Sequence, residues 1–364
     1  MNRLIETLEE FCNTMSPSGH ETNMVECISK KVEKLADTIY VDNLGNLIVE
    51  IGNPQKDRLL IDAHMDEVGL VVIQVTDTGQ ILFDKLGLID DRILLAREVA
   101  ILTSTGVIRG VIGIKGRHLM TSDELEKHID VRQMWIDTGM GADEQKAKGI
   151  KPGCGICFTT KFQMLPNQFI MGKSLDCRIG CAVAVEVIHR VFENSSELLD
   201  KTRLSFAFTS QEEIGAKGAS TVAFKLNPTA AIVLDTVPCD DSSFSGSTSS
   251  IKLGKGPVIR TYDSFPQSFL ASWTHPVFRE MIPRIAERES INYQIDVMTR
   301  TFLDSSTLQF TGAGIPTASL CFPRRYSHSP TEIAHLGDIE NSILLLIATL
   351  EELSNGVQFD RKIK

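Results

Sequence analysis

The sequence lacks any apolar run long enough to span a lipid bilayer. Its densest apolar stretch, Ser342–Leu350, has about half of the roughly 18 residues that a membrane helix requires. The first six residues include Glu6, where a signal peptide would begin its apolar core. We therefore expect a cytoplasmic protein that does not bind a membrane.

A surplus of basic residues is also absent. The 364 residues include 47 acidic and 37 basic side chains, which gives a formal charge of −10. A nucleic-acid partner is not expected, because binding to a phosphate backbone needs a basic face. The eight cysteines are scattered along the chain, and without a secretory signal they are expected to be free, buried thiols.

Several catalytic and cofactor motifs are missing as well. The sequence contains neither the GxGxxG dinucleotide fingerprint nor the GxSxG nucleophile elbow. The zinc-protease motif HExxH is absent, since His20-Glu21 is followed by Met24 at the position of the second histidine. Cys154 and Cys157 form a lone CxxC without a second pair at zinc-finger spacing, so we expect a structural or incidental role there in place of redox or metal function.

The composition that is present is typical of a globular protein, with 42% hydrophobic and 23% charged residues. The length suggests two domains or one large one. Helical periodicity is found over Leu4–Met15, Glu21–Leu35, Gly180–Phe192, Lys217–Lys225, His275–Arg288 and Ile339–Leu353. Strands are predicted over Asn43–Ile51, Arg58–Asp62, Leu204–Thr209, Ala230–Leu234 and Ala318–Phe322.

The order of these elements predicts an α/β fold. Buried apolar strands that alternate with helices imply a mostly parallel sheet with helices on both faces. Between about residues 70 and 165 the pattern changes to short, alternating strands separated by glycine, such as Val71–Val75 and Val99–Thr103. We therefore expect a discontinuous α/β domain made from residues 1–69 and 166–364, with an inserted β-rich domain at residues 70–165.

Two metal-capable side chains, His64 and Asp66, come directly after the strand predicted over Arg58–Asp62. Ligands of open α/β sheets bind at the carboxyl ends of strands. Residues two apart in an extended chain point to the same side, so Asp66 can accept the second ring N–H of His64 and fix its tautomer for a metal. The ordinary alternative is a histidine that ends a strand beside a solvated aspartate.

Other metal-capable residues stand near the ends of the remaining strands and at the start of a helix: Asp176, Glu212, Glu213, Asp235 and His328. Each has an ordinary alternative, such as a solvated loop or an exposed turn. Adjacent carboxylates such as Glu212 and Glu213 can also divide the work, one binding metal and the other acting as a general base. Together, two histidines and three carboxylates predict a dinuclear site for zinc, cobalt or manganese, in which one carboxylate bridges the ions.

With these motifs the chain resembles the metallopeptidase family that includes glutamyl, deblocking and tetrahedral (TET) aminopeptidases. The resemblance runs over essentially the whole chain, and the order and spacing of the motifs agree. The most specific motifs are Ala63–Gly69, Ser174–Gly180, Gln211–Gly215, Leu234-Asp235 and Arg324–Pro330. The resemblance implies a phosphorylase/hydrolase-like fold, with a mixed sheet flanked by helices and the β-rich insert as a dimerisation domain.

The resemblance also implies a set of metal ligands. Two divalent ions per subunit are expected, zinc or cobalt first and manganese as a further candidate. Asp176 is then the residue that bridges the two ions. His64 and Asp235 complete the shell of one ion, and Glu213 and His328 complete the shell of the other.

The implied activity is the removal of N-terminal residues from short peptides. Glu212 is expected to be the catalytic general base, and Asp66 is expected to orient His64. The implied assembly is a homo-oligomer in which dimers form a hollow tetrahedral dodecamer.

The chain departs from the family's pattern at two places. Cys177 stands where the family usually has a second aspartate after the bridging one, and a thiolate there can bind a metal or be oxidised. Asp304 is kept, but the bulky Phe302 and Leu303 precede it where the family tends to have a glycine-rich segment. Two alternatives to the aminopeptidase therefore stay open: a related metal hydrolase of another amide or acyl bond, and a catalytically weakened assembly protein.

Overall fold

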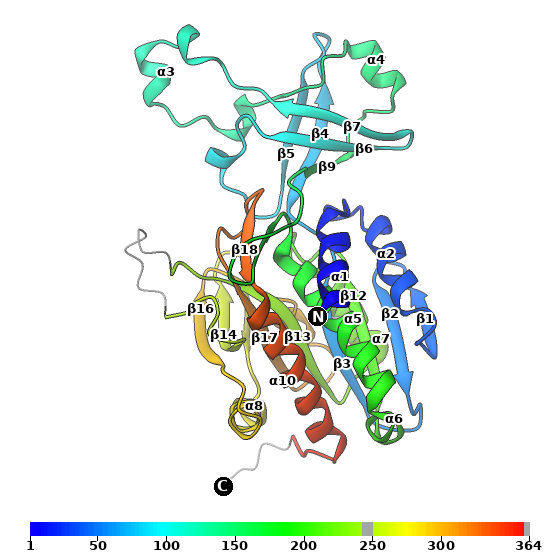
Figure 1. The fold of residues 1–364 in the computed structure, drawn as a ribbon. Coiled ribbons are helices and arrows are strands. Elements are labelled where there is room, and N and C mark those ends of the chain that lie inside the picture. Colours follow the sequence, from blue (N-terminus) through cyan, green and yellow to red (C-terminus); the bar gives the residue numbers. More distant parts are fainter. Residues whose placement is uncertain (242–249, 360–364) are drawn as a thin grey trace.

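The computed structural model of the chain describes residues 1–241 and 250–359. Its main feature is a mixed nine-stranded sheet with helices on both faces, which confirms the expected α/β class (Figure 1). The strand order is β1-β2-β12-β3-β13-β17-β14-β15, and β16 pairs with β14. These strands are β1 (Thr38–Val41), β2 (Leu47–Gly52), β3 (Arg58–His64), β12 (Arg203–Thr209), β13 (Ala230–Pro238), β14 (Val258–Phe265), β15 (Leu270–Trp273), β16 (Gln294–Thr299) and β17 (Thr317–Arg324).

The sheet is mixed and not mostly parallel as the alternation of elements predicts: its centre is parallel and its flanks are mostly antiparallel. Strands β12, β3, β13 and β17 run in the same direction. Strands β1 and β2 on one side, and β14 and β15 on the other, add antiparallel pairs. The four central strands are buried along nearly their whole length, which explains why they are predominantly apolar in the sequence. Their carboxyl ends meet at one edge of the sheet.

Helices cover the two faces of the sheet and enclose two apolar cores. The larger core contains side chains from α1 (Asn2–Asn13), α2 (Thr22–Val32), α5 (Leu175–Asn194), α8 (Pro276–Arg288) and α10 (Leu336–Ser354). The smaller core, on the other face, contains side chains from α7 (Lys217–Leu226) and α9 (Ser305–Leu308). A short helix, α6 (Ser196–Lys201), follows α5.

A closed β-barrel with its own apolar core lies beyond the carboxyl ends of the central strands (Figure 1). Its strands are β4 (Gly69–Val75), β5 (Ile81–Leu86), β6 (Glu98–Thr103), β7 (Gly106–Ile112), β8 (Ile136–Asp137) and β9 (Gly155–Phe158). Its short helices are η1 (Asp91–Ile93), η2 (Arg117–Leu119), α3 (Ser122–Glu126), η3 (Val131–Gln133) and α4 (Ala142–Ala147). A three-stranded sheet of β10 (Gln163–Met164), β11 (Phe169–Gly172) and β18 (Glu332–His335) follows the order β10-β11-β18.

Some elements differ from their predicted bounds. Strand β13 continues to Pro238, four residues beyond the predicted end at Leu234. The helix predicted from Gly180 begins at Leu175, although Asp176 and Cys177 within it have non-helical φ and ψ angles. Strands β1, β14, β15 and β16 of the large sheet were not predicted. The division of the chain at residues 70 and 165 stays a prediction. Within residues 1–241 and 250–359, no helix combines the length and apolar character needed to cross a membrane.

Candidate metal centre

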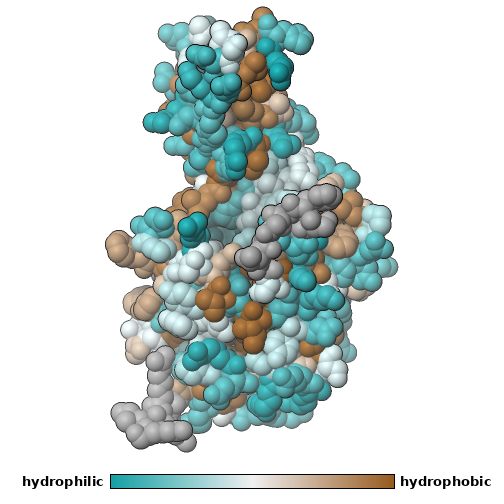
Figure 2. Space-filling view, turned by 90° about the vertical axis from the view of Figure 1, so that its left-hand side faces the viewer, coloured by the Kyte–Doolittle hydropathy of each residue, from teal (hydrophilic) through white to brown (hydrophobic). Residues whose placement is uncertain are grey.

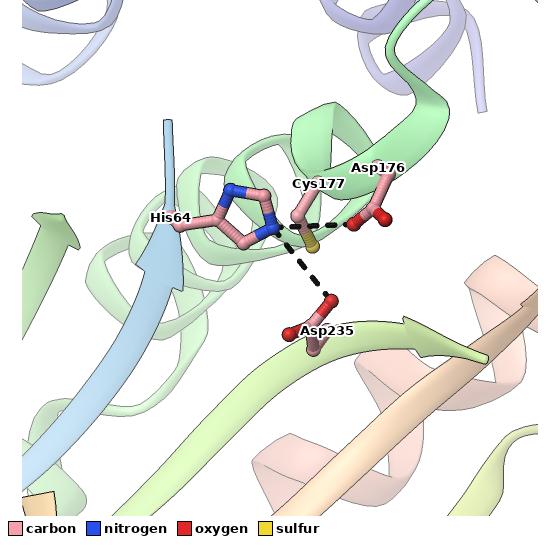
Figure 3. Close-up of side chains that lie close together, drawn as sticks. All are labelled: His64, Asp176, Cys177 and Asp235. Carbon is pink, nitrogen blue, oxygen red and sulfur yellow. Dashed lines mark hydrogen bonds and ion pairs between the residues drawn. The ribbon is translucent and has the colours of Figure 1, made fainter. Parts of the chain in front are cut away.

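The predicted site residues gather at the carboxyl edge of the parallel centre of the sheet. His64 is the last residue of β3, and Thr209, opposite it in the ladder, is the last residue of β12. Asp235 lies on the adjacent β13. Neighbouring parallel strands end at the same edge, and this is where α/β sheets bind ligands. Asp176 approaches this edge from the start of α5 (Figure 3).

One potential ion site is formed by His64, Asp176 and Asp235. The Nε2 atom of His64 lies 3.2 Å from Oδ1 of Asp176 and 3.7 Å from Oδ1 of Asp235. All three side chains point into the same small space (Figure 3). The Sγ atom of Cys177 belongs to the same group, in which all candidate ligand atoms lie within 4.8 Å of one another.

A second potential ion site shares Asp176 with the first. Nε2 of His328 lies 3.2 Å from Oδ2 of Asp176 and 3.5 Å from Oε2 of Glu213. The two sites thus use different oxygens of one carboxylate, as a bridging ligand does. The other ring nitrogen of His328, Nδ1, lies 3.0 Å from the carbonyl oxygen of Leu88. Donation from Nδ1 to that carbonyl leaves Nε2 free for an ion.

Leu88 belongs to the predicted insert, in the segment between β5 and η1. All five predicted metal ligands lie outside residues 70–165, yet this backbone carbonyl from the insert contacts one of them. The adjacent Gly87 has φ +88°, and a Cβ there would come within 2.8 Å of Val68 and 3.3 Å of Oε2 of Glu213. A glycine is therefore needed where this segment passes the site.

Asp66 connects the ends of β3 and β12. Its Oδ1 lies 3.4 Å from Nδ1 of His64 and accepts a hydrogen bond from the backbone N–H of Glu212. Its Oδ2 accepts from the hydroxyl of Ser18 and from the backbone N–H of Glu213. One fully buried carboxylate thus orients a candidate ligand and fixes the loop that carries the two glutamates.

Two residues outside the predicted set hold the opposite side of the site. The guanidinium of Arg324 donates to Oδ2 of Asp176 and to Oε1 of Glu332. Glu332 in turn accepts from the backbone N–H of His328 at 2.9 Å and from that of Asp176 at 3.2 Å. His328 has a left-handed φ of 55°, which costs a non-glycine residue roughly 1 kcal/mol, so the Glu332 contact stabilises a strained turn.

The electrostatics of the glutamates follow from their burial among other acids. Burial raises the pKa of Glu212 well above its usual range; His64 opposes this shift, and Asp235 and Glu213 reinforce it. Burial likewise raises the pKa of Glu213 to about 8 against the opposing effect of His328. A glutamate with a raised pKa is suited to taking up a proton near neutral pH.

The bridging position is held ionised instead. Burial by itself raises the pKa of Asp176, but Arg324, His328 and His64 together hold it well below its usual range. For His328, burial lowers the pKa, whereas Glu213 and Asp176 outweigh burial and raise it to about 9. For His64 too, burial lowers the pKa, but Asp176, Asp235 and Asp66 outweigh burial and raise it well above its usual range. Without metal, the carboxylates around both histidines therefore favour the protonated imidazoles.

The donor set fits divalent cations. Five buried carboxylates, those of Asp66, Asp176, Glu212, Glu213 and Asp235, surround two imidazoles. In the described part of the chain, Oε1 of Glu213 is buried without a hydrogen-bond partner. Carboxylate oxygens and imidazole nitrogens in this combination are ligands for zinc, cobalt or manganese. Such an ion would supply the positive charge that this cluster needs.

A pocket of about 330 Å³ opens onto the cluster. Both candidate ion sites and Glu212 line it, together with Leu88 and the segment from Met298 to Leu303. Phe302, one of the two bulky residues noted in the sequence, lies in this wall and contacts the ring of Phe265. Asp304 lies behind the wall, where its Oδ2 accepts from the hydroxyl of Thr209 at 2.6 Å.

The structure brings all seven predicted site residues together: His64, Asp66, Asp176, Glu212, Glu213, Asp235 and His328. Sequence reasoning missed Ser18, Leu88, Arg324 and Glu332. Arg324 stands inside the quoted motif Arg324–Pro330, and Glu332 follows His328 by four residues, so their proximity to a predicted ligand was the available signal. Ser18 lies 48 residues from Asp66, its partner, and offers no such signal. Leu88 acts through its backbone carbonyl and leaves no signal in its residue type.

An α/β sheet that carries buried carboxylates and imidazoles at the ends of its parallel strands is typical of metal-dependent hydrolases. A family model described as M42 glutamyl aminopeptidase matches residues 45–345, and the chain belongs to this family. The predicted family resemblance is therefore confirmed. Members of the family are aminopeptidases, which are hydrolases of peptide bonds.

Individual relatives match along nearly their full length. A protein of Acetivibrio thermocellus with the provisional name of aminopeptidase is 31% identical over 349 residues, which cover 95% of this chain and 98% of that protein. The TET aminopeptidase of a marine-sediment archaeon of the Thaumarchaeota superposes with a TM-score of 0.90 at 28% identity, covering 98% of this chain and 99% of that one. The TET1 peptidase of Pyrococcus horikoshii, described as able to assemble into a tetrahedron or a large octahedral shell, has a TM-score of 0.84 at 33% identity, with coverage of 95% and 99%.

Proposed function

We propose that this protein is a two-metal aminopeptidase that removes N-terminal residues from short peptides. The observation that carries the proposal is the position of Asp176 between two ligand groups. Its Oδ1 faces His64, and its Oδ2 faces His328. Two-metal hydrolases need a carboxylate in this position to hold both ions.

The proposed ligands are assigned to two ions according to the two potential ion sites described above. His64 and Asp235 hold one ion, Glu213 and His328 hold the other, and Asp176 bridges them. Zinc or cobalt is the proposed metal, with manganese as a further candidate, because these five residues offer imidazole nitrogens and carboxylate oxygens. When bound, such ions lower the pKa of a coordinated water and polarise a carbonyl oxygen.

Glu212 is the proposed catalytic base. It lines the pocket, and its carboxylate lies with His64 and Glu213 within 4.8 Å. Its raised pKa allows it to take a proton from water and to return it to the departing amine. Asp66 does not touch the substrate in this scheme. It keeps the ring of His64 and the backbone of Glu212 in place.

The substrate's free N-terminal amine would enter an acidic pocket. A protonated amine is attracted by the carboxylates around the ions, whereas an acetylated N-terminus carries no charge to be held there. The apolar part of the wall, which includes Leu88, Phe302 and Leu303, is suited to contact with the substrate's side chains.

We further propose a cytoplasmic homo-oligomer in which the barrel at residues 70–165 forms dimers, and the dimers form a tetrahedral dodecamer. The assembly described for the Pyrococcus horikoshii relative supports this kind of architecture. All eight cysteines lie in the described residues and are free and buried, which is expected in a reducing compartment.

The test is a substrate panel with the metal-loaded and the chelated protein. The panel contains short peptides with free and with acetylated N-termini, an acylated amine, and soluble cellulose. The proposal predicts stepwise loss of N-terminal residues from the free peptides, seen by mass spectrometry, and only in the presence of metal. Cleavage of the acylated amine or of cellulose without release of N-terminal residues would show a different hydrolase.

A further inference from the structure

The thiol of Cys177 points into the first ion site. Asp176 and Cys177 are consecutive residues, yet both side chains reach the space that faces His64 (Figure 3). Their non-helical backbone angles, φ −82° and ψ 116° for Asp176 and φ −108° and ψ 48° for Cys177, allow this. The Sγ atom lies within 4.8 Å of the candidate ligand atoms of His64, Asp176 and Asp235.

The position of this sulfur is fixed by its neighbours. Cys177 is fully buried, and its Sγ lies 3.4 Å from the carbonyl oxygen of Leu234. A Cβ at Gly180 would lie 2.6 Å from Sγ, so the helix leaves room for the sulfur by having glycine there. The side chain therefore has little freedom to turn away from the site.

The separations between these candidate ligand atoms suit one ion at the centre of the group. Tetrahedral zinc has bonds of about 2.0–2.1 Å to nitrogen, 2.0–2.2 Å to oxygen and 2.3 Å to sulfur, which places its ligand atoms roughly 3.3–3.8 Å apart. Nε2 of His64 lies 3.2 Å from Asp176 and 3.7 Å from Asp235. Cys177 supplies a fourth donor to the same space.

We propose that Cys177, as a thiolate, is the fourth protein ligand of the ion bound by His64, Asp176 and Asp235, and that it makes this site selective for zinc over manganese. This inference rests on the proposed two-metal function. On binding, the S–H bond breaks, the metal–sulfur bond forms, and the proton leaves to solvent. A thiolate is a soft ligand, which favours zinc and disfavours manganese.

Four protein ligands have a consequence for catalysis. Zinc sites closed by four protein ligands are mostly structural, whereas catalytic sites keep a position open. In this protein the residues on the side of Glu213 and His328 would then hold the ion that keeps a position open. The pocket wall formed by Leu88 and Ser327 also belongs to that side, because Leu88 contacts His328 and Ser327 precedes it.

The direct test is X-ray absorption of the zinc-loaded full-length protein, which needs no variant. The proposal predicts a sulfur scatterer at about 2.3 Å from zinc. The cobalt-loaded protein should in addition show a thiolate-to-cobalt charge-transfer band in the near ultraviolet. Bound metal without the sulfur scatterer and without the band overturns the proposal, as does failure to bind metal at this site. In that case the thiol of Cys177 only donates a hydrogen bond to the carbonyl oxygen of Leu234.

Variants sharpen the test. Cys177→Ser and Cys177→Asp should bind cobalt without the band, and their preference for zinc over manganese should fall by roughly tenfold or more. Cys181→Ser is the matched control, because Cys181 is a buried thiol one helical turn later and donates to the carbonyl of His64. It should keep the band. Loss of the band in Cys181→Ser but not in Cys177→Ser contradicts the assignment.

Peptide hydrolysis on the same samples separates this inference from the proposed function. Metal-dependent release of N-terminal residues by a protein without the sulfur signal leaves the aminopeptidase intact and removes Cys177 as a ligand. The sulfur signal in a protein that hydrolyses no peptide keeps Cys177 as a metal ligand and removes the proposed aminopeptidase function.

Discussion

The guanidinium of Arg324 contacts Asp176 through Oδ2, the oxygen that also faces His328, while Oδ1 faces His64. A fixed positive charge therefore sits beside the second ion site and not beside the first. Arg324 also donates to Thr236 and Glu332, so it cannot easily move aside. Arg324 stabilises the carboxylates of Asp176 and Glu332 when no metal is bound, and its positive charge opposes the binding of a metal ion at the second site.

The first prediction follows from this competition. Arg324→Met should destabilise the chelated protein by about 3–5 kcal/mol, because two buried carboxylates lose their partner. Addition of zinc should then raise the Tm of the variant by more than it raises that of the wild type. Thermal unfolding with and without metal measures both effects.

Arg324→Lys is the control for charge, since lysine keeps the cation but not the two-pronged geometry. Its gain in Tm on zinc addition should lie between those of the wild type and Arg324→Met. An equal or smaller gain in Arg324→Met than in the wild type contradicts the competition.

The second prediction concerns proton transfer. Glu212→Gln should lower kcat by roughly 10²–10⁴-fold, because a general base contributes about that factor. Metal content, measured by mass spectrometry of the purified protein, should stay at the wild-type value. Glu197→Gln, at an exposed helix position, is the control and should change neither quantity. A parallel loss of metal and activity in Glu212→Gln would instead identify Glu212 as a ligand.

The third prediction concerns the anchoring of the site. Asp66→Asn should weaken metal binding by roughly 10–100-fold, the usual effect of removing a group that orients a ligating histidine. It should also disturb the loop of Glu212, whose N–H it binds. Ser18→Ala removes one donor to Asp66 and should give a smaller loss. Titration with a competing chelator measures the metal affinity of both variants. An unchanged affinity in Asp66→Asn contradicts the role of Asp66 in orienting His64.

The fourth prediction is a pH dependence of stability. Burial and the nearby Asp66 raise the pKa of Glu21 to about 7. The pKa of Glu21 is thus higher in the folded than in the unfolded state, so ionisation of this carboxyl destabilises the fold. This destabilisation is absent below about pH 4.5 and complete above about pH 7. Glu21→Gln should therefore gain stability over the wild type as pH rises through this window, by on the order of 3 kcal/mol at most.

Glu10→Gln provides a control of opposite sign. Lys31 holds the pKa of Glu10 below its usual range, so this carboxylate stabilises the fold above its unfolded pKa. The variant should lose stability relative to the wild type as pH rises. Denaturant unfolding of chelated protein between pH 4 and pH 8 measures the differences, and a flat or falling difference for Glu21→Gln refutes the prediction.

The sequence predicts the site better than it predicts the supports of the site. His64, Asp235 and the glutamates follow from one rule, that parallel strands end together, and the rule needs no knowledge of distant contacts. The roles of Ser18 and Glu332 depend on contacts with residues remote in sequence, such as the backbone of Asp176. Residue type and spacing carry no information about such pairs.

The same limit explains the strands that were not predicted. Strand β14 contains the buried Arg260 and Asp263, which interrupt the apolar pattern. Arg260 is paired with Asp296 on the neighbouring strand, with Nε 3.0 Å from Oδ2. A buried charge becomes acceptable only through a partner, and here the partner is more than 30 residues away. The centre of the sheet, with continuous apolar runs, was predicted because burial alone accounts for it.

The central claim is that the cluster around Asp176 is a two-metal peptidase centre. Its most direct test is peptide hydrolysis by the chelated protein as zinc or cobalt is added in known equivalents per chain. The account predicts no release of N-terminal residues without metal and a rate that stops rising at two equivalents. Hydrolysis by the chelated protein, or a full rate at one equivalent, would contradict it.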